Sequence, residues 1–332
     1  MMKQIVEQLL KSRTVLVASH SHPDGDAIGA LLATGLALQS IHKDVRMYNE
    51  SPIPAVYRFL PSVSSIMQQT GPVDAYDAVV VLDCGDIERV GESAGKLACA
   101  KMIINIDHHL TNTLFGHLQA VDPTACATSE MVHRLIKSMR VKMDTAIATA
   151  IYTGILTDTG SFRFSNTNRS AFAICTEMIE QGTDPFEVAQ YVYGTYSLGR
   201  IKLLNLALDS LEISADGKIS VMTLTQAMMA ETGTQTQDID GLINYARSIE
   251  AVKVAALIHE TPLNGSAPGG KGKQYHVSLR SDGSVDVAQI ASQYGGGGHA
   301  SAAGFSVITT LEQLKAQILN LSETTPGLCE IN

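Results

Sequence analysis

Short apolar runs alternate with helical patterns through the first half of the chain. Continuous apolar runs of strand length cover residues 14–19, 78–83 and 103–107. Such runs are typical of strands buried on both faces of a parallel sheet. Apolar residues recur at helical spacing over residues 27–39, 129–137 and 145–156. This alternation predicts an α/β domain with a doubly wound, mainly parallel sheet.

The second half of the chain has a different pattern. A helical stretch at 197–211 is followed by strand-like runs at 218–223, 252–259 and 275–280 and by helical patterns at 238–247, 285–293 and 311–321. Residues 262–274 have the composition of a loop and are expected to join two strands. We therefore predict a first domain over 1–196, a helical linker over 197–211, and a smaller α/β domain with a mixed sheet over 212–332.

Length and composition fit this picture. The 332 residues, 45% of them hydrophobic, suffice for about two folded domains. No apolar run reaches the roughly 18 residues of a membrane-spanning helix, and residues 1–10 resemble an amphipathic helix more than a secretory signal. The five cysteines are scattered without a CxxC pair, so reduced thiols are expected and a thiolate zinc site is not. We expect a cytoplasmic protein that binds no membrane.

The formal net charge of −9 limits the kinds of nucleic acid that the protein is expected to bind. Duplex nucleic acid is bound through many Lys and Arg contacts to phosphate, so an acidic chain is a poor candidate for binding long duplexes. A small phosphate substrate remains compatible with this charge, because a bound metal cancels the charge of acidic ligands.

Aspartate and histidine residues follow four separate apolar elements. The first run leads into His20-Ser21-His22-Pro23-Asp24-Gly25-Asp26, the second ends at Asp83, the third ends at Asp107-His108-His109, and the helical stretch at 145–156 leads into Thr157-Asp158. Each segment alone is typical of a helix cap or a turn. The carboxyl ends of parallel strands lie on one edge, where open α/β sheets bind ligands. The residues expected to converge there are His20, Asp24, Asp26, Asp83, His108 and Asp158.

Such a cluster needs a positive partner, because unpaired buried carboxylates repel one another. The four aspartates carry a charge of −4, which two divalent ions would neutralise. Carboxylate and imidazole without thiolate suit Mn²⁺ or a similar ion, and two ions about 3.5–4 Å apart can activate water for attack on a phosphate. Gly25 and Gly29 are expected to let the first loop turn tightly into the next helix.

These motifs resemble the DHH phosphoesterase family, named for the residues found here at Asp107-His108-His109. The resemblance implies one metal ion held by His20, Asp24 and Asp83. It implies a second ion held by Asp26, Asp83, His108 and Asp158, with Asp83 bridging. His109 resembles the family residue that contacts the scissile phosphate, and Asp107 resembles the acid that orients the histidine pair. The resemblance assigns no role to His22.

The second half resembles the DHH-associated nucleotide-binding domain, through Arg280-Ser281 and the run from Gly295 to His299 that precedes Ala302-Ala303-Gly304-Phe305. The resemblance implies a substrate-binding role for Arg280, Ser281, Gly296, Gly297, Gly298 and His299, with the active site in the cleft between the domains. Glycines would let backbone N–H groups face a phosphate, and Arg280 offers a planar, permanently charged guanidinium group that suits a phosphate or a base.

Within this family, the size and motifs resemble the nanoRNase group. That resemblance implies hydrolysis of short oligoribonucleotides to nucleoside 5′-monophosphates, and of 3′-phosphoadenosine 5′-phosphate to AMP. A phosphodiesterase for linear or cyclic dinucleotides and a catalytically silent nucleotide sensor are the alternatives, although a sensor does not need six metal ligands. The sequence leaves open the ranking of short RNA, short DNA, 3′-phosphoadenosine 5′-phosphate and dinucleotides, as well as the cleavage polarity and the physiological metal. It also leaves open the oligomeric state, with a homodimer as one option.

Overall fold

The computed structural model describes residues 1–262 and 273–324, except for the side chains of Gln237, His299, Glu323 and Thr324. The chain divides into two compact units, Met1–Thr195 and Tyr196–Asn332. Most of the connection predicted at 262–274, and Cys329, lie outside the described residues.

The first unit is built on a six-stranded sheet in which every pairing is parallel. The strand order is β3-β2-β1-β4-β5-β6, so the order reverses between β1 and β4. The strands are β1 (Thr14–Ser19), β2 (Asp44–Tyr48), β3 (Ile66–Met67), β4 (Ala78–Leu82), β5 (Ile103–Asp107) and β6 (Leu118–Val121). The predicted parallel α/β sheet is confirmed.

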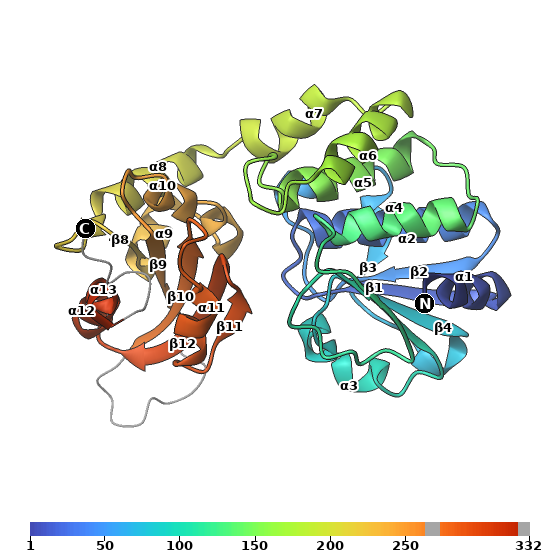
Figure 1. Ribbon diagram of the computed structural model, residues 1–332, viewed down its shortest axis with the longest axis horizontal. Helices are drawn as coiled ribbons and strands as arrows, with labels where there is room; N and C mark the ends of the chain where they lie inside the picture. The colour runs from blue at the N-terminus through green and yellow to red at the C-terminus, as the bar shows by residue number, and fades with distance from the viewer. Residues whose placement is uncertain (263–272, 325–332) are drawn as a thin grey trace. The chain divides into compact units, whose positions relative to one another are not determined.

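Alternate residues of the central strands pack into separate cores on the two faces of this sheet. Val15 and Val17 belong to the larger core with residues of six α-helices, and Leu16 and Ala18 belong to the smaller core with Leu97. Helices α2 and α4 lie over one face and the short helix α3 over the other (Figure 1). The helices are α1 (Met2–Lys11), α2 (Gly25–Ser40), α4 (Thr128–Ser138), α5 (Thr145–Asp158), α6 (Arg169–Glu180) and α7 (Pro185–Ala189) for the larger core, and α3 (Ala94–Leu97) for the smaller.

Helices α2 and α5 approach unusually closely, and the glycines of the first motif make this possible. A Cβ at Gly29 would lie 2.4 Å from the backbone oxygen of Ala150, and one at Gly25 would lie 2.3 Å from the Thr157 hydroxyl. Both glycines lie inside α2. The expectation that they serve a tight turn is therefore wrong: they are needed for helix packing.

Further short elements complete the first unit. They are η1 (Ala55–Tyr57), η2 (Val63–Ser65), η3 (Val73–Ala75), η4 (Ile87–Val90) and a π-helical turn η5 (Gln190–Gly194).

The second unit contains a mixed six-stranded sheet of order β11-β12-β10-β9-β8-β7. Only the β8–β9 pairing is parallel among the described strands of this sheet. The strands are β7 (Glu212–Ile213), β8 (Ile219–Leu224), β9 (Val254–Thr261), β10 (Lys273–Ser281), β11 (Gly297–His299) and β12 (Ala302–Thr309). The mixed sheet predicted for this half is confirmed.

Helices cover both faces of the second sheet. One core contains residues of α8, α9 and α10, and the other contains residues of α11, α12 and α13. Leu203 and Ala207 of α8 are buried in the first of these cores, so this helix packs as part of the second unit. The one helix expected over 238–247 is a 3₁₀ turn, η6 (Thr236–Ile239), and a short helix, α10 (Ile243–Arg247). The other helices are α8 (Leu198–Asp209), α9 (Gln226–Thr232), α11 (Val287–Ser292), α12 (Leu311–Leu319) and α13 (Leu321–Thr324).

Candidate metal centre

The carboxyl edge of the parallel sheet gathers the residues that the sequence pointed to. His20 directly follows β1, Asp83 follows β4, and Asp107 is the last residue of β5. Asp158 ends α5, which crosses α2 closely. The backbone of Asp83 has a φ of +57°, a left-handed conformation that aspartate adopts more readily than most residues.

Asp83 lies at the middle of the cluster. One carboxylate oxygen is 3.5 Å from His20 Nε2, and the other is 3.8 Å from His108 Nε2. His108 Nε2 is in turn 3.6 Å from Asp158 Oδ2, and His20 Nε2 is 3.9 Å from Asp24 Oδ1. Three groups of side chains each bring their donor atoms close enough to hold a cation. They are His20, Asp24 and Asp83; Asp26, His108 and Asp158; and Asp83, His108 and His109.

The two central histidines are oriented by backbone carbonyls. His20 Nδ1 lies 2.9 Å from the Ser21 oxygen, and His108 Nδ1 lies 3.3 Å from the Ala125 oxygen. A proton on each Nδ1 would donate to these carbonyls, which leaves the Nε2 lone pairs directed toward the carboxylates. This is the usual arrangement of metal-binding histidines, whose second nitrogen is held by a hydrogen bond.

The two aspartates of the first motif have different surroundings. Asp24 Oδ1 accepts hydrogen bonds from the backbone of Asp26 and Ala27 and so caps α2, and its side chain is about half exposed. Asp26 is buried and accepts hydrogen bonds from the backbone N–H groups of Thr128 (2.6 Å) and Ser129 (2.8 Å). Asp24 therefore combines a capping role with a place in the cluster, and Asp26 ties the first motif to the start of α4.

The charges and the burial of the cluster strongly shift the pKa values of its residues. Burial lowers the pKa of His20, but its hydrogen bond with Asp83 and the charge of Asp24 outweigh burial and raise it to about 9. The pKa of His108 is also raised to about 9, because Asp158 and Asp83 outweigh burial. Burial and the charge of Asp83 raise the pKa of Asp26 to about 7. Burial also raises the pKa of Asp158 well above its ordinary value. Without a cation, these groups hold protons that compensate the crowded carboxylates.

Asp107 and His109 form a close pair beside the cluster. His109 Nδ1 lies 2.6 Å from Asp107 Oδ1, and that carboxylate is fully buried. Burial lowers the pKa of His109, but the hydrogen bond to Asp107 and the charge of Asp83 raise it overall. The pair has the geometry of a histidine that is oriented by an acid.

Several polar residues that support this cluster were missed by the sequence interpretation. Asn112 Nδ2 donates to Asp107 Oδ2 (2.6 Å), and Asn166 Nδ2 donates to Asp158 Oδ2 (3.1 Å). The Thr128 hydroxyl donates to Asp83 Oδ1 (2.9 Å). Asn105, an amide within an otherwise apolar strand, accepts from Asn112 and was the one available signal in the sequence. His22, left unassigned, donates its backbone N–H to Ser51 Oγ.

The residues expected to bind substrate lie in the second unit. Arg280 is half-buried, and its Nη1 donates to the Leu279 carbonyl. Ser281 is buried, and its hydroxyl accepts from the backbone of Gly283, so it holds a turn. The backbone of His299 pairs with Ala302, which itself pairs with Arg280, while the His299 side chain lies outside the described part. These binding roles stay predictions.

The glycine run owes its composition partly to packing. A Cβ at Gly296 would lie 2.2 Å from the Gly304 oxygen, and one at Gly298 would lie 2.5 Å from the Ala302 oxygen, whereas Gly297 faces open space. The N–H groups of Gly295 and Gly296 bond to carbonyls at the end of α11. The idea that several of these N–H groups face one phosphate is therefore not supported for Gly295 and Gly296.

The donor set of the cluster suits a divalent cation. Buried carboxylates and imidazoles without thiolate are ligands of Mn²⁺ and related ions.

Among residues 1–262 and 273–324, the helices lack the combination of length and apolar character that a membrane crossing requires.

Comparisons with known proteins identify the family of the chain. Residues 14–155 match the model of the DHH family N-terminal domain, and residues 216–324 match the DHHA1 domain. The chain is 32% identical over 306 residues to the bifunctional oligoribonuclease and PAP phosphatase NrnA of Thermus thermophilus, covering 91% of this chain and 87% of the relative. It is 25% identical to the protein of the same name from Bacillus subtilis, covering 92% and 93%.

A solved structure is similar over the whole length. The exopolyphosphatase-related protein of Bacteroides fragilis superimposes with a TM-score of 0.89 at 27% identity, covering 99% of this chain and 97% of that protein. The domain matches and the long alignment with the Thermus thermophilus protein show that the chain belongs to the DHH family of phosphoesterases, with a DHHA1 domain in its second half.

Proposed function

We propose that this protein is a two-metal phosphodiesterase that hydrolyses short oligoribonucleotides to nucleoside 5′-monophosphates and 3′-phosphoadenosine 5′-phosphate to AMP. The observation that carries the proposal is the position of Asp83, whose two carboxylate oxygens face two different imidazoles. The printed names of the relatives from Thermus thermophilus and Bacillus subtilis supply the substrate class.

The proposed metal ligands are those that the resemblance to the family implies, and the clustering of their donor groups supports them. One ion would be held by His20, Asp24 and Asp83, and the second by Asp26, Asp83, His108 and Asp158. Mn²⁺ is the proposed ion, because imidazole ligands favour ions later in the divalent series than Mg²⁺. When bound, such ions lower the pKa of water and stabilise charge on the reacting phosphate oxygens.

The remaining residues orient the substrate. His109, held by Asp107, would donate a hydrogen bond to a non-bridging phosphate oxygen, and the raised pKa of His109 favours its protonated form. Arg280 would bind a further phosphate or a base through its planar guanidinium. Placing the phosphodiester correctly is a large part of catalysis, since interactions that align reacting groups lower the barrier.

A substrate panel tests this function. The metal-free protein is supplied with Mn²⁺ and given RNA dinucleotides, 3′-phosphoadenosine 5′-phosphate, cyclic dinucleotides and pyrophosphate. We expect the first two to be hydrolysed fastest. Preferred cleavage of a cyclic dinucleotide would instead identify the alternative phosphodiesterase, and nucleotide binding without any release of product would identify a sensor.

Asp83→Asn is the inactive control for this panel. Asparagine tolerates the left-handed backbone of position 83, so the turn is kept while the bridging charge is lost. Activity should fall by more than about 100-fold, the upper end of what losing an outer-shell partner of a metal costs. Activity close to wild type in excess Mn²⁺ would refute the bridging role.

A further inference from the structure

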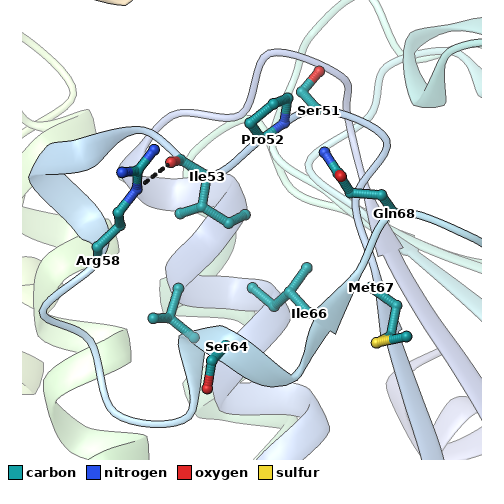
Figure 2. A pocket seen from close by; sticks show the side chains of 9 residues that line it. Ser51, Pro52, Ile53, Arg58, Ser64, Ile66, Met67 and Gln68 are labelled. Atoms are coloured by element: carbon teal, nitrogen blue, oxygen red, sulfur yellow. Dashed lines mark hydrogen bonds between the residues drawn. The ribbon is translucent and has the colours of Figure 1, made fainter.

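A cavity of about 510 Å³ lies within the first unit. It is formed by residues between Ser51 and Gln68, from the connection that follows β2, from β3 itself and from the residue after β3. Figure 2 shows Ile53 and Ile66 directed toward the same space, with Arg58 on one side and Gln68 on another. Its size lies in the range of roughly 300–1,000 Å³ that is usual for small-molecule sites.

One wall of this cavity is hydrogen-bonded to the loop that carries His20 and Asp24. Ser51 Oγ accepts from the backbone N–H of His22 at 2.9 Å. Asn49, which is buried, donates to the His20 carbonyl at 2.8 Å and accepts from the Ser51 N–H at 3.0 Å. The cavity wall and the first metal motif are therefore held as one piece.

The strand order places the cavity at a short distance from the cluster. β2 pairs with β1, and β3 pairs with β2, all in parallel. Neighbouring strands lie about 4.8 Å apart, so the end of β3 lies roughly 10 Å along the edge from the end of β1. A nucleotide whose phosphate lies at the cluster could reach across this interval with its sugar and base.

The lining of the cavity suits a flat heteroaromatic group. Ile53, Val63 and Ile66 supply aliphatic surface, and Gln68 supplies an amide. Arg58 is exposed, and its Nε donates to the Ile53 carbonyl at 3.0 Å, which ties the guanidinium to the wall of the cavity. Bases are recognised by stacking on aromatic or guanidinium planes and by hydrogen bonds to their edges.

A phosphate is a poorer occupant of the same space. The described residues that line the cavity include one cation, Arg58, and part of its hydrogen-bonding capacity is used by Ile53. The other polar side chains of the lining, those of Ser51, Ser64 and Gln68, are neutral, and the aliphatic side chains offer no donors to an anion. The lining therefore favours a neutral base over a second phosphate.

We propose that this cavity binds a nucleobase of the substrate whose phosphodiester lies at the metal centre. The proposal rests on the proposed function and adds a site for the base. Arg58 would be a specificity residue that stacks on the base, with the aliphatic side chains against the opposite surface and the Gln68 amide at the edge.

Kinetics with paired substrates test the role of Arg58. Arg58→Ala should raise KM for an RNA dinucleotide about tenfold, equivalent to about 1.4 kcal/mol, within the range found for stacking of a single base. Arg58→Lys should behave similarly, because it keeps the charge and loses the plane. An otherwise identical abasic dinucleotide should be hydrolysed equally by all three proteins. Arg13→Ala, at an exposed position before β1, is the matched control.

Photocrosslinking separates this proposal from the proposed function. A hydrolysis-resistant phosphorothioate dinucleotide carrying 4-thiouridine should attach within residues 51–68, with lower yield in Arg58→Ala. Attachment there without hydrolysis of any nucleotide by the wild type would refute the proposed function and support the base site. Hydrolysis with attachment elsewhere, or an unchanged KM in folded Arg58→Ala, would overturn the base site.

Discussion

Asp107 divides its two carboxylate oxygens between the two histidines that follow it and a supporting amide. Oδ1 receives His109 Nδ1 and the backbone N–H of His108, and Oδ2 receives Asn112 Nδ2 at 2.6 Å. The same amide nitrogen lies 3.2 Å from the carbonyl of Cys84, the residue after Asp83. Asn112 thus holds both the acid that orients His109 and the turn that presents Asp83, which makes it a positioning residue.

Replacing Asn112 should therefore lower turnover without emptying the site. We expect Asn112→Ala to reduce kcat by about 10–100-fold, the usual cost of losing an outer-shell partner. KM for a dinucleotide and bound Mn²⁺, measured by elemental analysis, should change little. Asn205→Ala, at an exposed position of α8, is the control. A loss of metal that parallels the loss of kcat would assign Asn112 a merely structural role.

Protons and metal ions compete for the same side chains. The raised pKa values, about 9 for His20 and His108 and about 7 for Asp26, mean that the metal-free cluster holds protons at neutral pH. Metal ligands must be deprotonated, so ion binding releases these protons.

Mn²⁺ affinity should consequently rise with pH. The increase should run through the interval from about pH 7 to about pH 9, where the raised groups lose their protons, and level off above it. Titration calorimetry in buffers with different ionisation enthalpies measures the protons released per ion. An affinity that is flat across this interval would contradict the proton-holding cluster.

At the scale of elements, long apolar runs were readable from the sequence and short mixed strands were not. Strands β1, β4 and β5 are continuous apolar runs, and they were predicted. β2, with the sequence DVRMY, and β6, with LQAV, carry polar residues and depend on pairing with their neighbours for their strand conformation.

The same distinction holds for the candidate site. Aspartates and histidines that follow apolar runs could be placed at one sheet edge in advance. Thr128 and Asn166 could not be linked to the site, because they contact Asp83 and Asp158 only once the helices are packed. Gly29 shows most clearly what could not be predicted from the sequence, since the backbone that it packs against, at Ala150, lies on another helix.

Two of the three glycines of α2, Gly29 and Gly35, offer a matched test of this packing. A Cβ at Gly29 would meet rigid backbone of α5, whereas one at Gly35 would meet the flexible end of Met47. Alanine favours a helix over glycine by about 1 kcal/mol, but overpacking costs about 1–3 kcal/mol. Gly29→Ala should lower the thermal midpoint followed by circular dichroism, and Gly35→Ala should lower it less or raise it. Equal midpoints would show that α2 and α5 adjust freely.

For the molecule as a whole, the net charge of −9 limits the length of a polyanionic substrate. Non-specific binding of single strands relies on a positive groove that follows the backbone and on aromatic side chains that stack with the bases. This chain has 24 Lys and Arg against 33 Asp and Glu and no tryptophan, so each phosphate beyond the site meets a mainly acidic protein. Affinity should therefore come from the few nucleotides bound at specific groups.

The preference for short RNA is the prediction that follows from this charge. At equal molar concentration and moderate salt, RNA of about two to four nucleotides should be hydrolysed at least about tenfold faster per molecule than RNA of about twenty nucleotides, because only specific contacts outweigh acidic repulsion. Arg280→Ala should raise KM for the dinucleotide while bound Mn²⁺ is unchanged, and kcat should fall too if that contact also aligns the phosphodiester. Lys202→Ala, which removes an exposed charge from α8 of the same unit, should leave both constants close to wild type. Faster degradation of the long RNA, with Arg280→Ala behaving as wild type, would mean that the protein follows polymers through a surface other than the predicted one.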